Sequence, residues 1–184
     1  MDGPLADFDA HFWRLTLNEG WPADVPDGTA QAHRYASDHI IDDAHRRMAR
    51  AAIEETGWFR ALPVTPGAQA GVDQLLSSGA EIVVCTKPLQ ESPTCRDEKA
   101  AWLTEHFPEL AANVVMTPDK SWVHGTVLLD DAIPAGWIPK AIWSPVVFTA
   151  PFNGPGTVWA QFPHWSWGDP VDALIGAGYA TGRR

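Results

Sequence analysis

The sequence has little cysteine, little positive charge and no long apolar run. Two cysteines among 184 residues are too few for a disulfide framework or a four-thiolate zinc site. Lysine and arginine number 13 against 23 aspartates and glutamates, which argues against general nucleic-acid binding, because that needs a basic surface. No run approaches the ~18 apolar residues that cross a bilayer, and no basic-then-apolar leader opens the chain. These absences favour a soluble, cytoplasmic protein that binds neither nucleic acid nor membrane.

The sequence does contain an alternation of short apolar segments with helical segments. Its length suits one domain, or one core with a small insert. Continuous apolar strands that alternate with helices indicate an α/β fold, a parallel sheet with helices on both faces. Gly79 follows the second helix and suits a C-terminal cap. The predicted helices are residues 43–56, 67–78 and 95–107, and the predicted strands are residues 81–86, 113–117, 126–131 and 146–150.

Two regions depart from this alternation. Residues 13–66 are rich in Pro, Trp, His and Asp, and we interpret them as a small, mainly helical cap inserted after the first strand. The core then comprises residues 1–12 and 67–184. The last 30 residues hold Trp159, Trp165 and Trp167 among several Pro and Gly residues, and they predict a tail that tryptophans pin to the core.

Polar residues finish several of the predicted strands, which is where α/β sheets bind ligands. The Asp2-Gly3 pair suits a tight turn whose backbone N–H groups face an anion. Thr86, at the tip of a buried strand, can donate to a phosphate oxygen. Lys120 can neutralise phosphate charge. Taken singly, each is commonplace: a turn, a strand end and a solvated surface lysine.

The most specific single signal is the Asp130-Asp131 pair at the end of an apolar strand. Two adjacent carboxylates there are costly unless they are paired or bind a cation. Hard oxygen ligands beside a phosphate suit Mg²⁺, which keeps waters and shares ligands with its substrate. Capping of a helix by one of the two aspartates is the alternative.

The order of these motifs resembles that of the haloacid dehalogenase superfamily. Within it, nearly the whole chain is similar to the 5'(3')-deoxyribonucleotidase family, whose first motif runs Asp-Met-Asp-Gly-x-Leu-Ala-Asp-Phe. The matching segments are Met1-Asp2-Gly3, Leu5-Ala6-Asp7-Phe8, Cys85-Thr86-x-Pro88, Asp119-Lys120, Leu129-Asp130-Asp131 and Phe148-Thr149-Ala150. The resemblance implies a Rossmannoid parallel sheet, with the first strand largely missing from this chain.

By this resemblance the protein is an Mg²⁺-dependent phosphatase of deoxyribonucleoside monophosphates, which transfers phosphate to an aspartate and then to water. Asp2 would be the general acid and base. The resemblance also implies the other site residues: Gly3, Thr86, Lys87 and Lys120 for the phosphate, Phe8 and Tyr35 for the nucleoside, and Asp2, Asp130 and Asp131 for the metal. The small-molecule partner is then a nucleoside monophosphate, and a homodimer is compatible with the sequence.

The chain departs from the family pattern at three places. Met1 occupies the middle of Asp-Met-Asp, so none of the 184 residues supplies the nucleophile, and we expect almost no turnover from this chain as it stands. There are two explanations: a methionine codon within the motif was taken as the start, or the chain is truncated. We favour the first, because the other motifs remain. Lys87 replaces a small hydroxyl residue and Ala132 replaces a common arginine, which affects the base and sugar preference.

Two other functions remain compatible with the sequence. The same fold can act on another small phosphomonoester, because function depends on the site and the cap rather than on the fold. The chain can also be a catalytically inactive nucleotide-binding protein. A panel of phosphomonoesters, tested with an N-terminally extended protein, distinguishes the first alternative. Robust Mg²⁺-dependent hydrolysis by the 184-residue chain, with Asp2 required, would refute the second.

Overall fold

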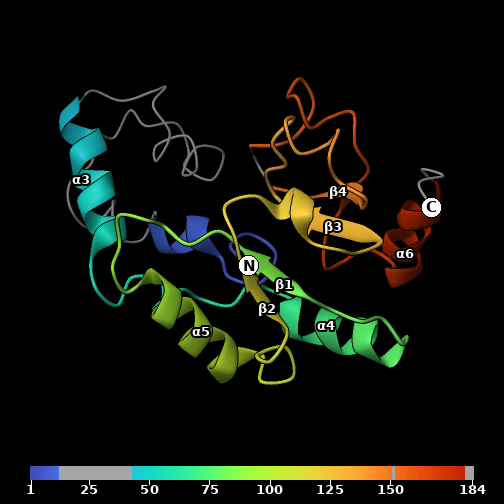
Figure 1. Ribbon diagram of the computed structural model, residues 1–184, viewed down its shortest axis with the longest axis horizontal. Helices are drawn as coiled ribbons and strands as arrows, with labels where there is room; N and C mark the ends of the chain where they lie inside the picture. Colours follow the sequence, from blue (N-terminus) through green and yellow to red (C-terminus); the bar gives the residue numbers. More distant parts are fainter. Residues whose placement is uncertain (13–42, 151, 181–184) are drawn as a thin grey trace.

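A computed structural model describes residues 1–12, 43–150 and 152–180, in which helices alternate with short strands (Figure 1). The helices are α3 (Asp43–Glu54), α4 (Ala68–Ser77), α5 (Cys95–His106), α6 (Val171–Ala180) and the 3-10 helix η2 (Lys120–Trp122). The strands are β1 (Val84–Thr86), β2 (Val114–Met116), β3 (Val127–Asp130), β4 (Ser144–Phe148) and β5 (His164–Trp165). All three predicted helices and all four predicted strands are therefore confirmed, with ends shifted by a few residues.

The named strands of the described residues pair in parallel, as the alternation predicts. In the described residues β1 pairs with β2, so that Val84 lies opposite Val114, and the second sheet has the order β3-β4-β5. The connection from β1 to β2 runs through α5, because parallel neighbours need a crossover. The described strands thus form two sheets, and β1 and β3 are each paired on one side only.

The last part of the chain contains two elements that the sequence analysis did not predict, β5 and α6. Phe148 of β4 lies opposite Trp165 of β5, and Leu174 of α6 is buried in the same apolar cluster as Phe148. Packing against β4 therefore outweighs the weak helix preference of a segment that contains Gly176 and Gly178.

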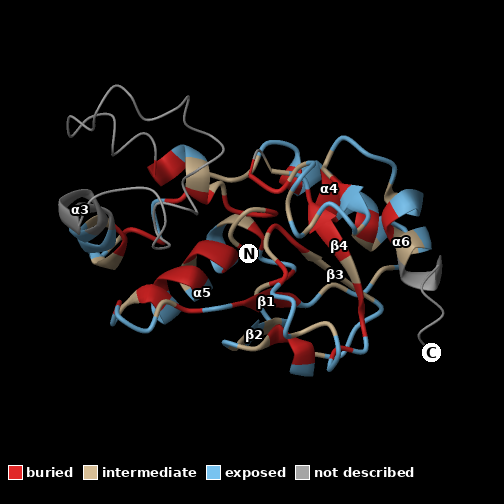
Figure 2. Cartoon of the chain, turned by 90° about the horizontal axis from the view of Figure 1, so that it is seen from above, coloured by how far each residue is buried: buried red, intermediate tan, exposed pale blue. Residues whose placement is uncertain are grey.

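Tryptophan side chains pin the chain together, as predicted for the tail. The indole N–H of Trp159 donates to Ile133 O at 3.0 Å, and that of Trp167 donates to Pro4 O at 2.6 Å. Trp165 is 2% exposed. In the cartoon coloured by burial, the buried segments lie along β1 and β4 and on the faces of α4 and α5 (Figure 2). Cys85, in β1, is a free, buried thiol.

The division into a core and a cap of residues 13–66 stays a prediction, because residues 13–42 lie outside the described part. Ile53, Trp58, Phe59 and Leu62 share one buried cluster with Met1, Phe12 and Trp102. Trp102 Nε1 also donates to Leu62 O at 2.7 Å. None of the described helices is long and apolar enough to cross a membrane.

Candidate active site

The polar residues singled out in the sequence meet where parallel strands end. Thr86 is the last residue of β1, Asp130 is the last residue of β3, and Lys120 opens η2 after β2. The Asp2-Gly3 turn, near the start of the chain, is held from two sides. Gly3 N donates to Ala6 O at 2.8 Å, and the Thr65 hydroxyl donates to Gly3 O at 2.7 Å.

A buried lysine that the sequence analysis missed joins two of these residues. Lys99 Nζ in α5 donates to Asp2 Oδ2 at 2.5 Å and to the Thr86 hydroxyl at 3.1 Å. The pKa of Asp2 is subject to opposing effects. Burial raises it, but the charge and hydrogen bond of Lys99, together with the N-terminal ammonium, outweigh burial and hold the pKa below its ordinary value of 3.8. Asp2 is therefore a carboxylate at neutral pH in this structure.

A second buried ion pair stands at the end of β3. Lys120 Nζ contacts Asp130 Oδ2, and both residues are buried. Burial lowers the pKa of Lys120, but the Asp130 carboxylate outweighs this effect and raises the pKa above 10.5. Lys120 therefore stays charged, as a residue that neutralises phosphate must be. Trp143 Nε1 fixes its backbone by donating to Lys120 O at 3.0 Å.

The Asp2-Gly3 turn approaches the end of β3 closely. A β-carbon built on Gly3 would lie 2.5 Å from Asp131 Oδ2, so only glycine allows the turn to sit against this carboxylate. Asn153, which is fully buried, holds the same strand end by donating to Asp131 O at 2.9 Å and Phe148 O at 2.7 Å. Its place in a Gly-Pro-rich loop gave no sequence signal for this role.

The three aspartates expected to bind metal lie in one neighbourhood: Gly3, which follows Asp2, packs against Asp131, and Asp131 directly follows Asp130. Among the described residues, however, no three acidic, histidine or cysteine side chains form a ready cluster for a metal. This donor set still fits Mg²⁺, which takes one or two carboxylates and completes its shell with water and phosphate oxygens. Asp2 Oδ1 is moreover buried and has no hydrogen-bond partner.

For the other expected site residues, the described part of the structure shows no contact that bears directly on the expected role. The Lys87 carbonyl accepts from Lys99 Nζ at 3.1 Å, while its side chain is exposed. The Gly3 N–H is used within its own turn. Phe8 is 7% exposed and stacks on Phe12, with ring centroids 6.2 Å apart. Tyr35 lies outside the described residues. The roles of these residues stay predictions.

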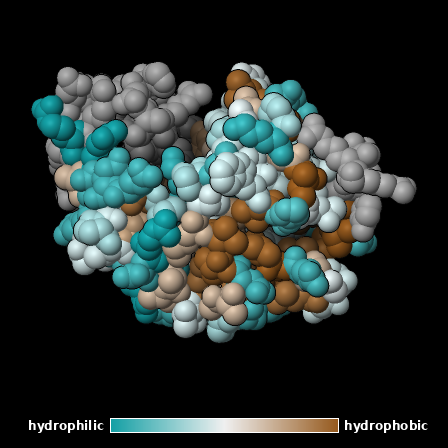
Figure 3. All heavy atoms as spheres, viewed as in Figure 1, coloured by the Kyte–Doolittle hydropathy of each residue, from teal (hydrophilic) through white to brown (hydrophobic). Residues whose placement is uncertain are grey.

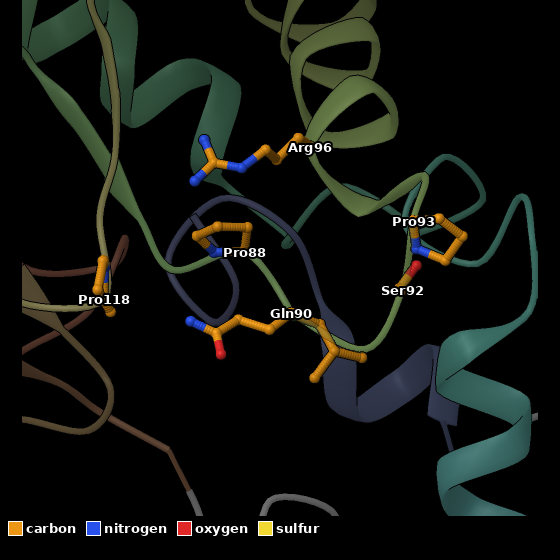
Figure 4. A pocket seen from close by; sticks show the side chains of 7 residues that line it. Pro88, Gln90, Ser92, Pro93, Arg96 and Pro118 are labelled. Atoms are coloured by element: carbon orange, nitrogen blue, oxygen red, sulfur yellow. The ribbon is translucent and has the colours of Figure 1, made fainter.

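Two hollows adjoin the site. The first, of about 300 Å³, is formed by the loops that follow β1 and β2, and Arg96 and Gln90 extend on either side of Pro88 there (Figure 4). The second is an apolar groove of about 600 Å³ between residues 82–85 and residues 126–129, with Met1 also in its lining. It accounts for the band of apolar atoms between the two sheets in Figure 3.

An α/β core with aspartate, threonine and lysine side chains at the ends of parallel strands is the arrangement expected of a haloacid-dehalogenase-type protein. The comparisons with known proteins narrow this class. Residues 1–167 match the family of "5' nucleotidase, deoxy (Pyrimidine), cytosolic type C protein", and the chain belongs to this family.

Individual relatives agree with the family match. A protein of Bordetella bronchiseptica, provisionally named a 5'(3')-deoxyribonucleotidase, is 30% identical over 98% of this chain and 96% of its own length. The human mitochondrial 5'(3')-deoxyribonucleotidase is 30% identical over 83% of this chain and 69% of its own length. The human cytosolic type is 28% identical, over 83% of this chain and 79% of its own length.

Proposed function

We propose that this protein is an Mg²⁺-dependent phosphatase that hydrolyses deoxyribonucleoside monophosphates to nucleoside and phosphate. The family match and the names of the relatives support the reaction class. The observation that carries the proposal is the environment of Asp2. One of its carboxylate oxygens is held by a buried ammonium, and the other is buried without a hydrogen-bond partner. A buried oxygen without a partner is costly and is suited to exchanging a proton with a substrate.

Each side chain has a role that its position supports. Asp2 is a carboxylate in the free protein, so it first takes up one proton, from solvent or from a monoanionic substrate. It then gives that proton to the leaving oxygen of the nucleoside as general acid and, as general base, takes a proton back from water. The Thr86 hydroxyl and the Lys120 ammonium bind the phosphate oxygens, because such transfer depends on positioning and charge neutralisation. The hollow beside Pro88 has room for the group that carries the phosphate. Arg96 and Gln90 offer that group hydrogen-bond donors.

Mg²⁺ would be held by Asp130, Asp131 and the backbone carbonyl of Asp2. Bound there, it neutralises part of the phosphate charge. The chain's own contribution is to keep these carboxylates together: Lys120 balances Asp130, and Gly3 lets the turn approach Asp131. Isothermal titration of Mg²⁺ into the protein and into an Asp130→Asn variant tests this set, and equal affinities would contradict it.

The proposed covalent step needs a nucleophile. We assign this role to an aspartate on a segment that leads into Met1, in the family order Asp-Met-Asp-Gly. The groove between the sheets supports this assignment. It is lined by two strands that are each paired on one side, it is apolar, and Met1 lies in its lining. An extended apolar segment fits such a groove, because it can pair with both strand edges.

The experiment compares two forms of the protein. One is the 184-residue chain, and the other, the extended form, carries a short apolar segment and an aspartate ahead of Met1. We expect the extended form to hydrolyse deoxythymidine monophosphate with Mg²⁺, and its Asp2→Asn variant to lose ~10²-fold or more in kcat. Faster hydrolysis of sugar phosphates would favour the alternative substrate class. Binding of the nucleotide without hydrolysis by either form would favour the inactive nucleotide-binding protein.

The cellular setting is part of the same proposal. One human relative is named a cytosolic type and another a mitochondrial protein, and we propose a cytoplasmic location for this chain. A nucleoside monophosphate as partner, the lack of nucleic-acid and membrane partners, and a homodimer stay predictions.

A further inference from the structure

Lys99 is buried although it carries a charge. Its relative exposure is 1%, and it lies in the middle of α5. A buried ammonium is uncommon and costly unless each of its three protons meets an acceptor. In this structure all three protons do so. The placement of this side chain therefore needs an explanation beyond the solubility of a helix face.

The three acceptors come from three different parts of the site. Nζ donates to the Asp2 carboxylate at 2.5 Å, to the Thr86 hydroxyl at 3.1 Å and to Lys87 O at 3.1 Å. Because the three acceptors surround one nitrogen, the carboxylate of Asp2 has a fixed position relative to the end of β1. Thr86 is the residue expected to bind the phosphate, so the ammonium sets the distance between acid and substrate.

The two carboxylate oxygens of Asp2 are not equivalent. Oδ2 is held by Lys99, whereas Oδ1 is buried without a partner among the described groups. A proton carrier needs one such oxygen free, and it needs that oxygen to stay in one place. Without the ammonium, rotation about the side-chain bonds would exchange the two oxygens and move both.

Lys99 is itself held from the opposite side. Its Nζ lies 4.8 Å from the centroid of the Phe59 ring, a cation–π contact. The preceding residue, Glu98, accepts from the backbone N–H of Gly57 at 2.7 Å and of Phe59 at 3.0 Å. Helix α5 thus supplies the ammonium of Lys99 and, through Glu98, also holds the backbone of Phe59, whose ring contacts that ammonium.

We propose that Lys99 is the positioning residue for Asp2 and holds Oδ2 so that Oδ1 serves the proton transfer. The proton transfer itself rests on the proposed function. In this role Lys99 acts through the orientation of Asp2 and not by direct contact with the reacting atoms. Lys120, the other buried lysine of the site, is paired with Asp130 and supplies a matched control.

The decisive measurement is the side-chain rotamer of Asp2, by NMR coupling constants about χ1 at neutral pH in the 184-residue chain. We expect a single rotamer in the wild type and in Lys120→Met, and rotamer averaging in Lys99→Met with the remaining amide spectrum preserved. Lys99→Arg, which keeps the charge and the donors, should restore the single rotamer. Averaging in the wild type itself would overturn the inference, even if Lys99→Met failed to fold. A single rotamer in Lys99→Met would overturn it too.

A kinetic measurement with the extended form separates positioning from general damage. Deoxythymidine monophosphate has a poor leaving group that needs an acid, whereas p-nitrophenyl phosphate has a good one. Lys99→Met should lower kcat about 10²-fold on the nucleotide and far less on p-nitrophenyl phosphate, with KM little changed on either. Equal losses on both substrates would contradict positioning. If the extended form with Lys99 intact hydrolyses neither substrate, the proposed function is wrong, and the rotamer measurement alone decides the inference.

Discussion

Replacing Gly3 with alanine should destabilise the folded protein for two reasons, the backbone conformation at this position and one close contact. Gly3 has φ +84°, and an alanine in this left-handed conformation costs about 1 kcal/mol. The new Cβ would also lie 2.5 Å from Oδ2 and 2.7 Å from Cγ of Asp131. Forcing such a group into a packed site costs about 1–3 kcal/mol. We therefore expect Gly3→Ala to lower the free energy of unfolding by about 2–4 kcal/mol.

Gly79→Ala is the matched control, because Gly79 has the same φ of 84° and nothing within 4 Å of a Cβ built on it. Urea unfolding of the two variants should show a loss of about 1 kcal/mol for Gly79→Ala, the cost of the backbone alone. Shortening Asp131 to alanine in the Gly3→Ala background should recover part of the additional loss. Equal losses in the two glycine variants would refute the close approach of the turn to Asp131.

Further predictions concern the contacts around α5 and α4. Glu98→Ala leaves two backbone N–H groups without their carboxylate and should cost about 2–4 kcal/mol in urea unfolding, whereas Glu105→Ala, on an exposed ion pair, should change it by less than about 1 kcal/mol. Burial raises the pKa of Glu98, but its hydrogen bonds outweigh burial and lower the pKa below 4.5. The stability that this carboxylate contributes is therefore full above about pH 4.5, and it is lost as the pH falls through the folded pKa. We expect the difference in unfolding free energy between the wild type and Glu98→Gln to narrow in acid. Gly71→Ala should lower the melting temperature despite the better helix propensity of alanine, because its Cβ would lie 2.0 Å from Trp167 Cε3; an unchanged or higher melting temperature would contradict this packing.

The main elements of the fold could be predicted because their signals are local. The apolar run that ends at Thr86 and the run that ends at Asp130 are strands in the structure, since each is continuous, short and followed by polar residues. Gly79 ends its helix with a positive φ, as predicted. The helix Val171–Ala180 could not be predicted in this way, because its stability comes from contacts with β3, β4 and α4.

The candidate site was predicted in outline by the same local signals. Thr86 and Asp130 stand out because each ends a strand, and Lys120 because it comes soon after one. Side chains at the carboxyl ends of strands are expected at the ligand-binding edge of such a fold. Lys99 gave no such signal. It lies inside a helix after Asp97 and Glu98, where the sequence alone favours a solvated charged face. Its burial depends on the Asp2 carboxylate, which is 97 residues away in the chain.

The two buried ion pairs of the site are better explained by function than by stability. A buried ammonium and carboxylate lose more hydration than their attraction returns in many proteins, and apolar side chains of similar size often fill such places at no loss. Here both pairs lie at the same rim, one joining Lys99 to Asp2 and one joining Lys120 to Asp130. Stability alone gives no reason for two such pairs to gather around one space. The proposed phosphatase site gives each pair a role: Lys99 would orient the proposed proton carrier, and Lys120 would balance the charge of the phosphate.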